Sequence, residues 1–328
     1  MRSALRLRRL ALLALLVLAP PAFAGDCGGV DLSADPSIKP DWKAHADVML
    51  NGEGLLWRID KPGLAPSYLY GTMHSTQDGP IRLAREAAPY AEKASAIATE
   101  LGDIDTSKKI EIGAAMLREA MSPDADTFAG LIEGEDAQRV EAMLAAKGTP
   151  AVMAHRLKLW MLTVAASLPK CEIEGQAKNL PEVDQSFAEI GAAHHIPVIG
   201  LETVEDQMRV LASITPALAA AQLKSMARGG GMADGGYATL LSLYDQKKPA
   251  AALAVLDAAP GVTPEERAAS DELTRRLLAD RNDAMAARAA PLLAKGGVFI
   301  AVGALHLSGK RGLIELLRAR GYRVSKVW

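Results

Sequence analysis

The chain has 328 residues, of which 49 % are hydrophobic and 4 % aromatic, and its formal net charge is −2. That length suffices for one large domain or two small ones. The slightly negative charge argues against nucleic acid, or an anionic membrane surface, as the main partner.

The first 24 residues have the pattern of an export signal. Four arginines precede or flank the start of the apolar run LALLALLVLA, and Ala22-Phe23-Ala24 supplies a small-residue cleavage site. The run is shorter than the roughly 20 apolar residues that cross a bilayer. We therefore expect cleavage near Ala24, which lowers the formal charge from −2 to −6 by removing the four arginines. The mature chain is expected to be periplasmic or secreted, without stable membrane insertion.

Residues 25–50 lack periodicity and are rich in Gly, Pro and Asp, which favours an irregular leader ahead of a domain over 51–328. Cys27 lies in this leader, and the second cysteine is Cys171. An oxidising compartment permits one disulfide between them. Sequence carries no geometry, however, so two free cysteines remain an equal alternative.

Strand and helix patterns alternate after the leader. GLLWRID and SYLYGTMH flank the turn-rich KPGLAP and predict a β-hairpin. Further strands are expected at SAIATE, IPVIGLE, GVFIAVG and YRVSKVW. Helical patterns fill about 104–194 and 203–295, the second being interrupted by the linker-like ARGGGMADGG. This order predicts an α/β fold, a central mixed sheet with a large helical insertion.

The expected core strands end in residues that can bind a metal or move a proton. These residues are His74, Glu100, Glu202 and His306. Each histidine closes a Gly-x-x-His sequence, one starting at Gly71 and the other at Gly303. Functional groups in open α/β sheets gather beyond the carboxyl ends of the strands, so neighbouring strands would bring the four side chains to one pocket. Taken singly, each histidine could bond a backbone carbonyl, and each glutamate could sit in the first turn of a helix.

Two neutral imidazoles and two carboxylates suit a divalent transition ion such as Mn, Co or Zn, with an open position for water. Bound water of lowered pKa would then be the nucleophile. We expect His74, His306 and Glu202 as metal ligands. We expect Glu100, Glu202 and Arg281 as catalytic residues, and leave open which glutamate is the ligand and which is the base.

Arg281 gives an independent signal. Leu277, Arg281 and Met285 follow one another at helical spacing, which directs the guanidinium toward the interior. Because arginine is rarely buried alone, it should meet Glu100, Glu202 or a substrate oxyanion. The alternative is an arginine that reaches out from a loosely packed face. Asp184 either holds a histidine tautomer or is solvated.

The chain resembles the TraB/GumN family, whose animal relatives include the Tiki metalloproteases, from about residue 54 to the C-terminus. The resemblance is carried in order by YLYGTMHS, ATELGD, IPVIGLETVEDQM, LLADRNDAMA and FIAVGALHLSGKRGLIELLRARGYRV. It implies an α/β fold related to the erythromycin-esterase-like proteins. It also implies a metal-dependent peptidase site at His74, Glu100, Glu202, Arg281 and His306. Family members often have an aspartate two residues after the first glutamate, where this chain has Gly102 followed by Asp103.

The leading hypothesis is an exported metal-dependent hydrolase that acts on a peptide or another small envelope substrate. One alternative keeps these residues but uses no metal, with a histidine as general base and a glutamate orienting it. The other alternative is a non-catalytic periplasmic protein that binds a peptide or supports polysaccharide export. The oligomeric state is left open.

Overall fold

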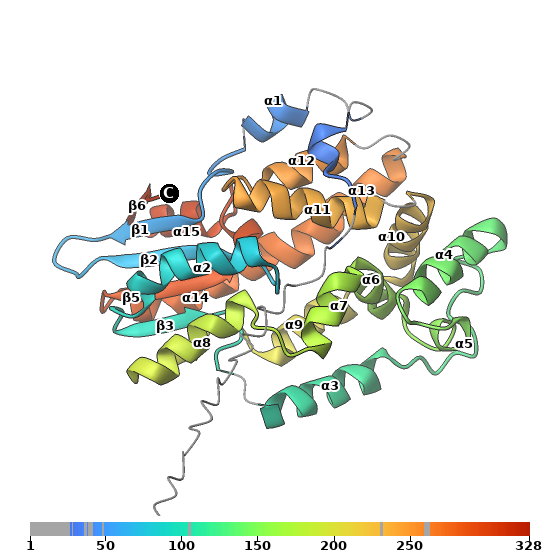
Figure 1. Ribbon diagram of the computed structural model, residues 1–328, viewed down its shortest axis with the longest axis horizontal. Helices are drawn as coiled ribbons and strands as arrows, with labels where there is room; N and C mark the ends of the chain where they lie inside the picture. The colour runs from blue at the N-terminus through green and yellow to red at the C-terminus, as the bar shows by residue number, and fades with distance from the viewer. Residues whose placement is uncertain are drawn as a thin grey trace, which may run out of the picture.

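The computed structural model describes residues 27, 29–35, 38, 42–47, 49–103, 106–229, 232–258 and 263–328. The predicted export signal and its cleavage site lie outside these residues. One mixed sheet, at the left in Figure 1, has the strand order β4-β3-β5-β2-β1-β6. The strands are β1 Leu56–Asp60, β2 Ser67–Thr72, β3 Ala96–Thr99, β4 Val198–Gly200, β5 Val298–Gly303 and β6 Arg323–Lys326.

The pairing of the strands confirms the expected α/β fold. β1 pairs antiparallel with β2, as the hairpin prediction required, and antiparallel with β6. The other neighbours, β2 with β5, β5 with β3 and β3 with β4, are parallel. Four adjacent strands therefore point the same way, and their carboxyl ends share one edge of the sheet.

Helices cover both faces of the sheet. Successive side chains of β5 point to opposite faces, and both sets are buried against helices. Val298, Ile300 and Val302 share a core with residues of α14 (Asp280–Leu293) and α15 (Leu313–Ala319). Phe299 and Ala301 point to the opposite face and share a core with residues of α2 (Asp78–Ala91) and α8 (Val183–His194). Because β5 is buried on both faces, it reads as a continuous apolar run.

The helical insertions build a third core beside the sheet. The first contains α3 Thr106–Ala120, α4 Gly134–Ala146, α5 Ala151–Ala154, α6 Leu159–Ser167 and α7 Lys170–Ala177, and it ends with α8. The second contains α9 Val204–Ala212, α10 Pro216–Arg228, α11 Met232–Asp245, α12 Ala251–Asp257 and α13 Pro264–Thr274, followed by a π-helical turn at Arg275–Ala279 and α14. Phe128, Leu144 and Trp160 of the first pack with Leu223 of the second. The two insertions thus form one helical layer, separated in sequence by β4.

The glycine-rich stretch ARGGGMADGG is not a linker along its whole length, because α11 begins at Met232 and includes its last two glycines. A Cβ on Gly235 would lie 3.1 Å from the Leu32 side chain and from the Val30 carbonyl oxygen. The glycine therefore lets the N-terminal segment pack closely on α11. That segment, expected to be irregular, contains a 3₁₀ turn at Leu32–Ala34 and the short helix α1, Trp42–Asp47.

A disulfide joins Cys27 to Cys171, across a sequence separation of 144 residues. It links the segment near the N-terminus to α7. Of the two alternatives left open by the sequence, a disulfide or two free cysteines, the structure has the disulfide. No helix in the described part of the chain is long and apolar enough to cross a bilayer.

Removal of this disulfide should destabilise the protein, because a closed loop of 144 residues restricts the unfolded chain strongly. Loop-closure entropy gives an upper value of about 5 kcal/mol in the free energy of unfolding. The measurement is denaturant unfolding of a Cys27→Ser/Cys171→Ser double variant against the oxidised wild type. The reduced wild type is the matched control and should behave like the double variant; equal stability of all three proteins would contradict the prediction.

Candidate functional site

The four predicted residues lie beyond the carboxyl ends of the four parallel strands. His74 follows β2, Glu100 follows β3, Glu202 follows β4 and His306 follows β5. The pairing continues past the strands, since the Glu202 N–H donates to the Glu100 carbonyl at 2.7 Å. The sheet itself thus fixes the spacing of the two glutamates.

The two Gly-x-x-His sequences begin side by side. Thr72 of the first pairs with Gly303 of the second in the β2–β5 register. A Cβ on Gly71 would lie 2.9 Å from the Ala304 Cα, and one on Gly303 would lie 3.2 Å from the Glu100 Oε1. Glycine at these positions therefore lets the two strand exits, and the Glu100 carboxylate, approach closely.

Arg281 joins both glutamates in one buried ion cluster. Its Nη2 donates to Glu100 Oε2 at 2.7 Å and to Glu202 Oε2 at 2.5 Å, and its Nε donates to Glu202 Oε1 at 2.9 Å. Its Nη1 donates to the Leu277 carbonyl at 3.0 Å. Glu100 and Glu202 are 7 % and 5 % exposed, so the guanidinium supplies the positive charge that two buried carboxylates need. The prediction that Arg281 turns inward to meet a glutamate is confirmed.

The Glu100 carboxylate is held at both oxygens. Its Oε1 accepts from the Gly303 N–H at 2.8 Å, and its Oε2 accepts from Arg281 and, at 3.2 Å, from Gln207 Nε2. Burial alone would raise the pKa of Glu100, but the neighbouring His306, His74 and Arg281 and the Gly303 N–H lower it to about 2. Both imidazoles therefore lie close enough to act electrostatically on this one carboxylate.

His306 is oriented by Asn282. The Asn282 Nδ2 donates to the Arg311 carbonyl at 2.9 Å, so its Oδ1 faces the His306 Nδ1 at 2.6 Å. The Nδ1 must then carry the proton, which leaves a lone pair on Nε2, 3.8 Å from Glu100 Oε1. Burial lowers the pKa of His306 to about 4. The ring is accordingly neutral at pH 7.

His74 is oriented by Asp184 of α8. Its Nδ1 lies 2.7 Å from Asp184 Oδ2, and Thr72 Oγ1 donates to Asp184 Oδ1 at 2.8 Å. The Asp184 carboxylate raises the pKa of His74, an effect that water weakens because the His74 side chain is 68 % exposed. Asp184 therefore lies beside the His74 Nδ1 and favours the protonated ring, while its Oδ2 has no hydrogen-bond partner among the described residues.

The donor set fits a divalent metal ion in its chemistry. His306 has Nδ1 occupied by an oxygen and Nε2 turned elsewhere, which is how metal-binding histidines are usually held. His74 has its Nδ1 2.7 Å from Asp184 Oδ2, and that carboxylate favours the protonated ring. Glu202 differs, because both of its oxygens accept from Arg281. Within the described residues, only Cys27, Cys171 and Glu172 bring three ligand atoms within 4.8 Å of one another. The disulfide uses both of those sulfurs, so that cluster is no thiolate site.

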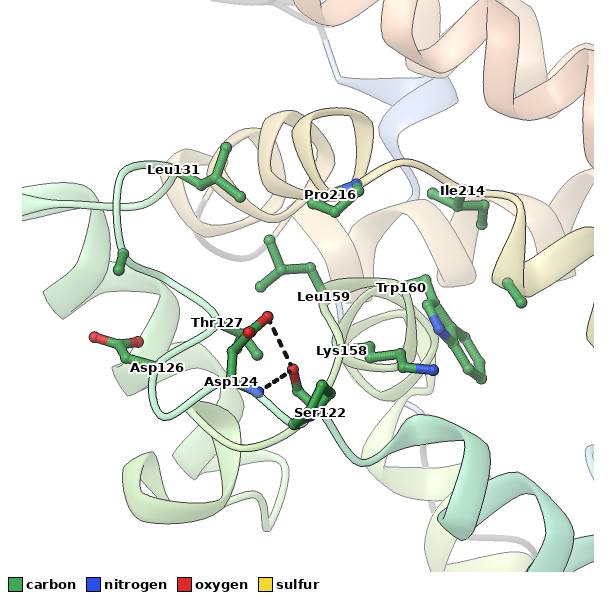
Figure 2. Close-up of a pocket in the computed structure, with 13 residues that line it drawn as sticks. Ser122, Asp124, Asp126, Thr127, Leu131, Lys158, Leu159, Trp160, Ile214 and Pro216 are labelled. Carbon is green, nitrogen blue, oxygen red and sulfur yellow. Dashed lines mark hydrogen bonds between the residues drawn. The ribbon is translucent and has the colours of Figure 1, made fainter.

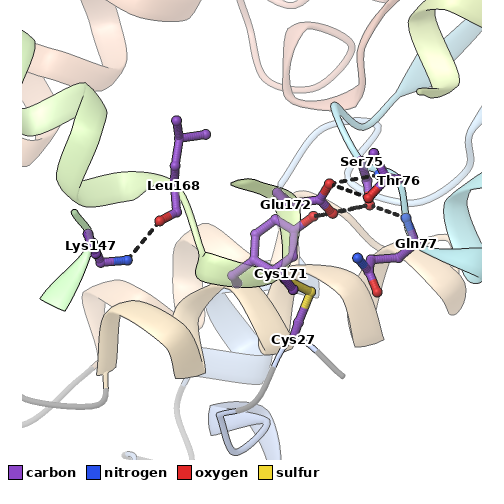
Figure 3. Close-up of a disulfide and its surroundings, with 9 residues drawn as sticks. Cys27, Ser75, Thr76, Gln77, Lys147, Leu168, Cys171 and Glu172 are labelled. Carbon is purple, nitrogen blue, oxygen red and sulfur yellow. Dashed lines mark hydrogen bonds between the residues drawn. A yellow bond between two sulfur atoms is a disulfide. The ribbon is translucent and has the colours of Figure 1, made fainter. Parts of the chain in front are cut away.

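The loop that follows His74 is fastened to α7 by a buried carboxylate beside the disulfide (Figure 3). Glu172, 2 % exposed, accepts from the Ser75 hydroxyl and from both the N–H and the hydroxyl of Thr76, each at 2.8 Å. The Tyr237 hydroxyl donates to it as well. Neutral donors from two distant segments thus meet on one carboxylate and hold the chain next to His74.

Sequence reasoning missed Gln207, Asn282 and Glu172. Asn282 had a weak signal, because it stands beside Arg281 on a helix whose inner face was recognised. Gln207 lies one turn into α9, after the capping box of Thr203 and Asp206, which fixes where that helix begins. Glu172 carried no signal, since nothing in the sequence links it to Ser75 and Thr76.

The glycine in place of an acidic residue after Glu100 has a structural explanation. Gly102 has a φ of +76°, and a Cβ there would lie 2.9 Å from the Gly200 backbone nitrogen. A side chain would push β4 away from β3 at this edge. The following acid, Asp103, is exposed.

Comparison with known proteins adds one finding. The model of the family described as TraB/PrgY/gumN matches residues 55–326. Searches with this chain return no matching curated protein and no matching solved structure.

Replacement of Arg281 by methionine should leave two buried carboxylates without their cation. Breaking such a buried pair costs about 3–5 kcal/mol in the free energy of unfolding, and urea unfolding measures it. Arg288→Met is the matched control, because Arg288 is on the same helix but its side chain is 42 % exposed. Equal losses in the two variants would contradict the cluster's importance.

Glu172→Gln should loosen the loop after His74. The glutamine NH₂ group is a donor, and it would face the Ser75, Thr76 and Tyr237 donors that now bind the carboxylate. We expect a loss of about 2–3 kcal/mol in the free energy of unfolding and faster hydrogen exchange at the Thr76 amide. Glu174→Gln, on the same helix with a side chain that is 46 % exposed, serves as control. Unchanged exchange at Thr76 would contradict the fastening role.

Proposed function

This chain belongs to the TraB/PrgY/gumN family, and on that premise we propose that it is an exported metal-dependent hydrolase that cleaves peptides. One observation carries the proposal. His306 is fixed through Nδ1 by Asn282 and has its Nε2 3.8 Å from the Glu100 carboxylate, and His74, after the neighbouring strand β2, acts electrostatically on the same carboxylate. Nitrogen and carboxylate donors together suit a divalent transition ion, and His74 would release the proton that Asp184 favours when the ion binds.

In the proposal, His74 and His306 hold the ion through Nε2, and a glutamate completes the set. Glu100 is the better placed glutamate, because its Oε1 is 3.8 Å from His306 Nε2 and accepts only a backbone N–H among the described residues. Glu202, our expected ligand from sequence, would first have to exchange its contacts with Arg281. A divalent ion such as Mn, Co or Zn would lower the pKa of a bound water enough to give a nucleophile at neutral pH.

Arg281 and Glu202, the remaining residues, would position the other groups of the site and balance their charge. Arg281 holds Glu100 and Glu202 at fixed places and, of its five N–H groups, leaves one Nη1 hydrogen without a partner among the described residues. That hydrogen could stabilise an oxyanion in the transition state. Glu202 is the candidate general base, provided that one of its oxygens is released as substrate enters.

Two further observations support the exported location and the substrate class. The Cys27–Cys171 disulfide is compatible with an oxidising compartment outside the cytosol. The peptide substrate rests on the sequence resemblance to the metalloprotease relatives. An exported peptidase of this kind would act in the periplasm or after secretion.

Metal content gives the direct test. The purified protein is dialysed against Mn, Co or Zn salts, and bound metal is measured by elemental analysis. We expect about one ion per chain in the wild type, and a fall of at least about tenfold in metal affinity for His74→Ala and for His306→Ala, because each loses a ligand.

His194→Ala is the matched control, since His194 ends α8 and is exposed. It should bind metal like the wild type. Circular dichroism checks that each variant is folded. A folded wild type that takes up no metal, or equal metal binding in all three variants, would remove the proposed mechanism.

A metal-free hydrolase keeps one observation in its favour. The fixed tautomer of His306 presents an unprotonated Nε2 next to Glu100, so this histidine could accept a proton from water directly. Peptide hydrolysis after exhaustive chelation separates the two candidates. Activity that survives chelation and disappears in His306→Ala would favour this second mechanism.

A further inference from the structure

Helix α7 is attached to the rest of the protein through one narrow face. Of its eight residues only Cys171, Glu172 and Gly175 are buried, and the other five are exposed. Its largest apolar side chain, Ile173, is 37 % exposed. A helix usually docks through an apolar stripe along one face, which α7 lacks. Its position therefore depends on the individual contacts of the three buried residues.

These contacts lead to the disulfide and to the loop after His74 (Figure 3). Cys171 carries the disulfide, and the next residue, Glu172, accepts from the N–H and the hydroxyl of Thr76, each at 2.8 Å. A Cβ added to Gly175 would overlap the Thr76 hydroxyl oxygen, so α7 packs tightly on the same residue. Helix α7 thus connects the disulfide directly to the chain that follows His74.

The helices on either side of α7 have anchors of their own. Leu159 and Trp160 of α6 pack in the third core, and Figure 2 shows them at the wall of a cavity of about 420 Å³ in the helical layer. Val183 and Phe187 of α8 are fully buried against the sheet. Helix α7 can therefore open locally while α6 and α8 stay in place.

The segment that contains Cys27 is loosely held as well. Gly29 and Val30 are exposed, and Leu32 is the first buried residue after Cys27 in the described part of the chain. Once the S–S bond is broken, little else keeps Cys27 beside α7. Cys27 is partly exposed and Cys171 is buried, so the Cys27 side of the bond is the more accessible to a reductant.

His74 depends on this connection because packing does not fix it. Its side chain is 68 % exposed and lies against Asp184. We propose that the Cys27–Cys171 disulfide is a redox switch for the proposed metal site. The intact bond keeps α7 docked and the chain after His74 ordered, and reduction releases both. The effect on metal binding rests on the proposed function, whereas the ordering of the chain does not.

Reduction requires a dithiol, such as dithiothreitol or the paired cysteines of a thiol–disulfide exchange protein. One thiolate of the dithiol attacks the Cys27 sulfur, the S–S bond breaks, and Cys171 leaves as a thiolate that takes up a proton. The second thiolate then attacks the mixed disulfide and releases Cys27, which is protonated in turn. The protein gains two electrons and two protons, and the dithiol becomes a disulfide.

Hydrogen exchange at the Thr76 amide tests the switch without any substitution. The wild type is compared in its oxidised form and after reduction with dithiothreitol, over a series of low urea concentrations. Exchange through local opening does not depend on urea, whereas exchange through global unfolding does. We expect the urea-independent rate at Thr76 to rise at least about tenfold on reduction, and the urea-independent rate at Phe187 to stay the same. No rise at Thr76, or an equal rise at both amides, would overturn the proposal.

Glu172→Gln separates the connection through α7 from other effects of reduction. The carboxylate that joins α7 to Thr76 is already lost in this variant, so reduction should change the Thr76 rate less than about twofold. Glu174→Gln, on the same helix with a side chain that is 46 % exposed, is the matched control and should keep the rise of the wild type. A rise as large as that of the wild type in a folded Glu172→Gln variant would also overturn the proposal.

The affinity for Mn²⁺ tests the consequence for His74. Reduced thiols could bind the ion themselves, because the ligand atoms of Cys27, Cys171 and Glu172 lie within 4.8 Å of one another. The Cys27→Ser/Cys171→Ser variant avoids this, and we expect it to bind Mn²⁺ at least about fivefold more weakly than the oxidised wild type. Equal affinity would overturn the link to His74. A wild type that binds no divalent ion would contradict the proposed function, and the exchange at Thr76 would still decide the switch.

Discussion

The contact of Arg281 with two buried carboxylates is the interaction on which the strand-end site depends. Parallel pairing brings Glu100 and Glu202 together whether or not a cation is present, since the Glu202 N–H bonds the Glu100 carbonyl. Two ionised carboxylates in that position repel each other and have lost water. The guanidinium reaches them from α14, 181 residues beyond Glu100. A π-helical turn at Arg275–Ala279 immediately precedes that helix, and such turns are frequent at functional sites.

The two histidines are held from opposite faces of the sheet. Asp184, on α8, lies beside His74 on one face of the sheet, and Asn282, on α14, orients His306 from the opposite face. The site therefore exists only where three layers meet: the sheet supplies the spacing, and each outer layer orients one ring.

Periodicity in the sequence was enough to predict the strands, their helices and the residues at the strand ends, because burial on two faces leaves a continuous apolar pattern. Arg281 was also predictable, because a charged residue on an apolar helix face needs a partner. Asn282 and Gln207 were not, since an amide becomes informative only when its neighbours in space are known. The glycine-rich stretch before Tyr237 was predicted to be a linker, but close packing on Leu32, rather than flexibility, accounts for Gly235.

The position of β5 has a consequence for how the chain acquires its structure. This strand comes from residues 298–303 but lies between β2 and β3, which are made from the first third of the chain. Until the final thirty or so residues have emerged from the ribosome, β2 and β3 have unsatisfied edges facing a gap. Assembly of the sheet is therefore a late, long-range event. A chain that must stay unfolded while it passes through a translocation channel would gain from such a delay. A chain whose synthesis stopped before β5 would expose unpaired strand edges that can bind other chains.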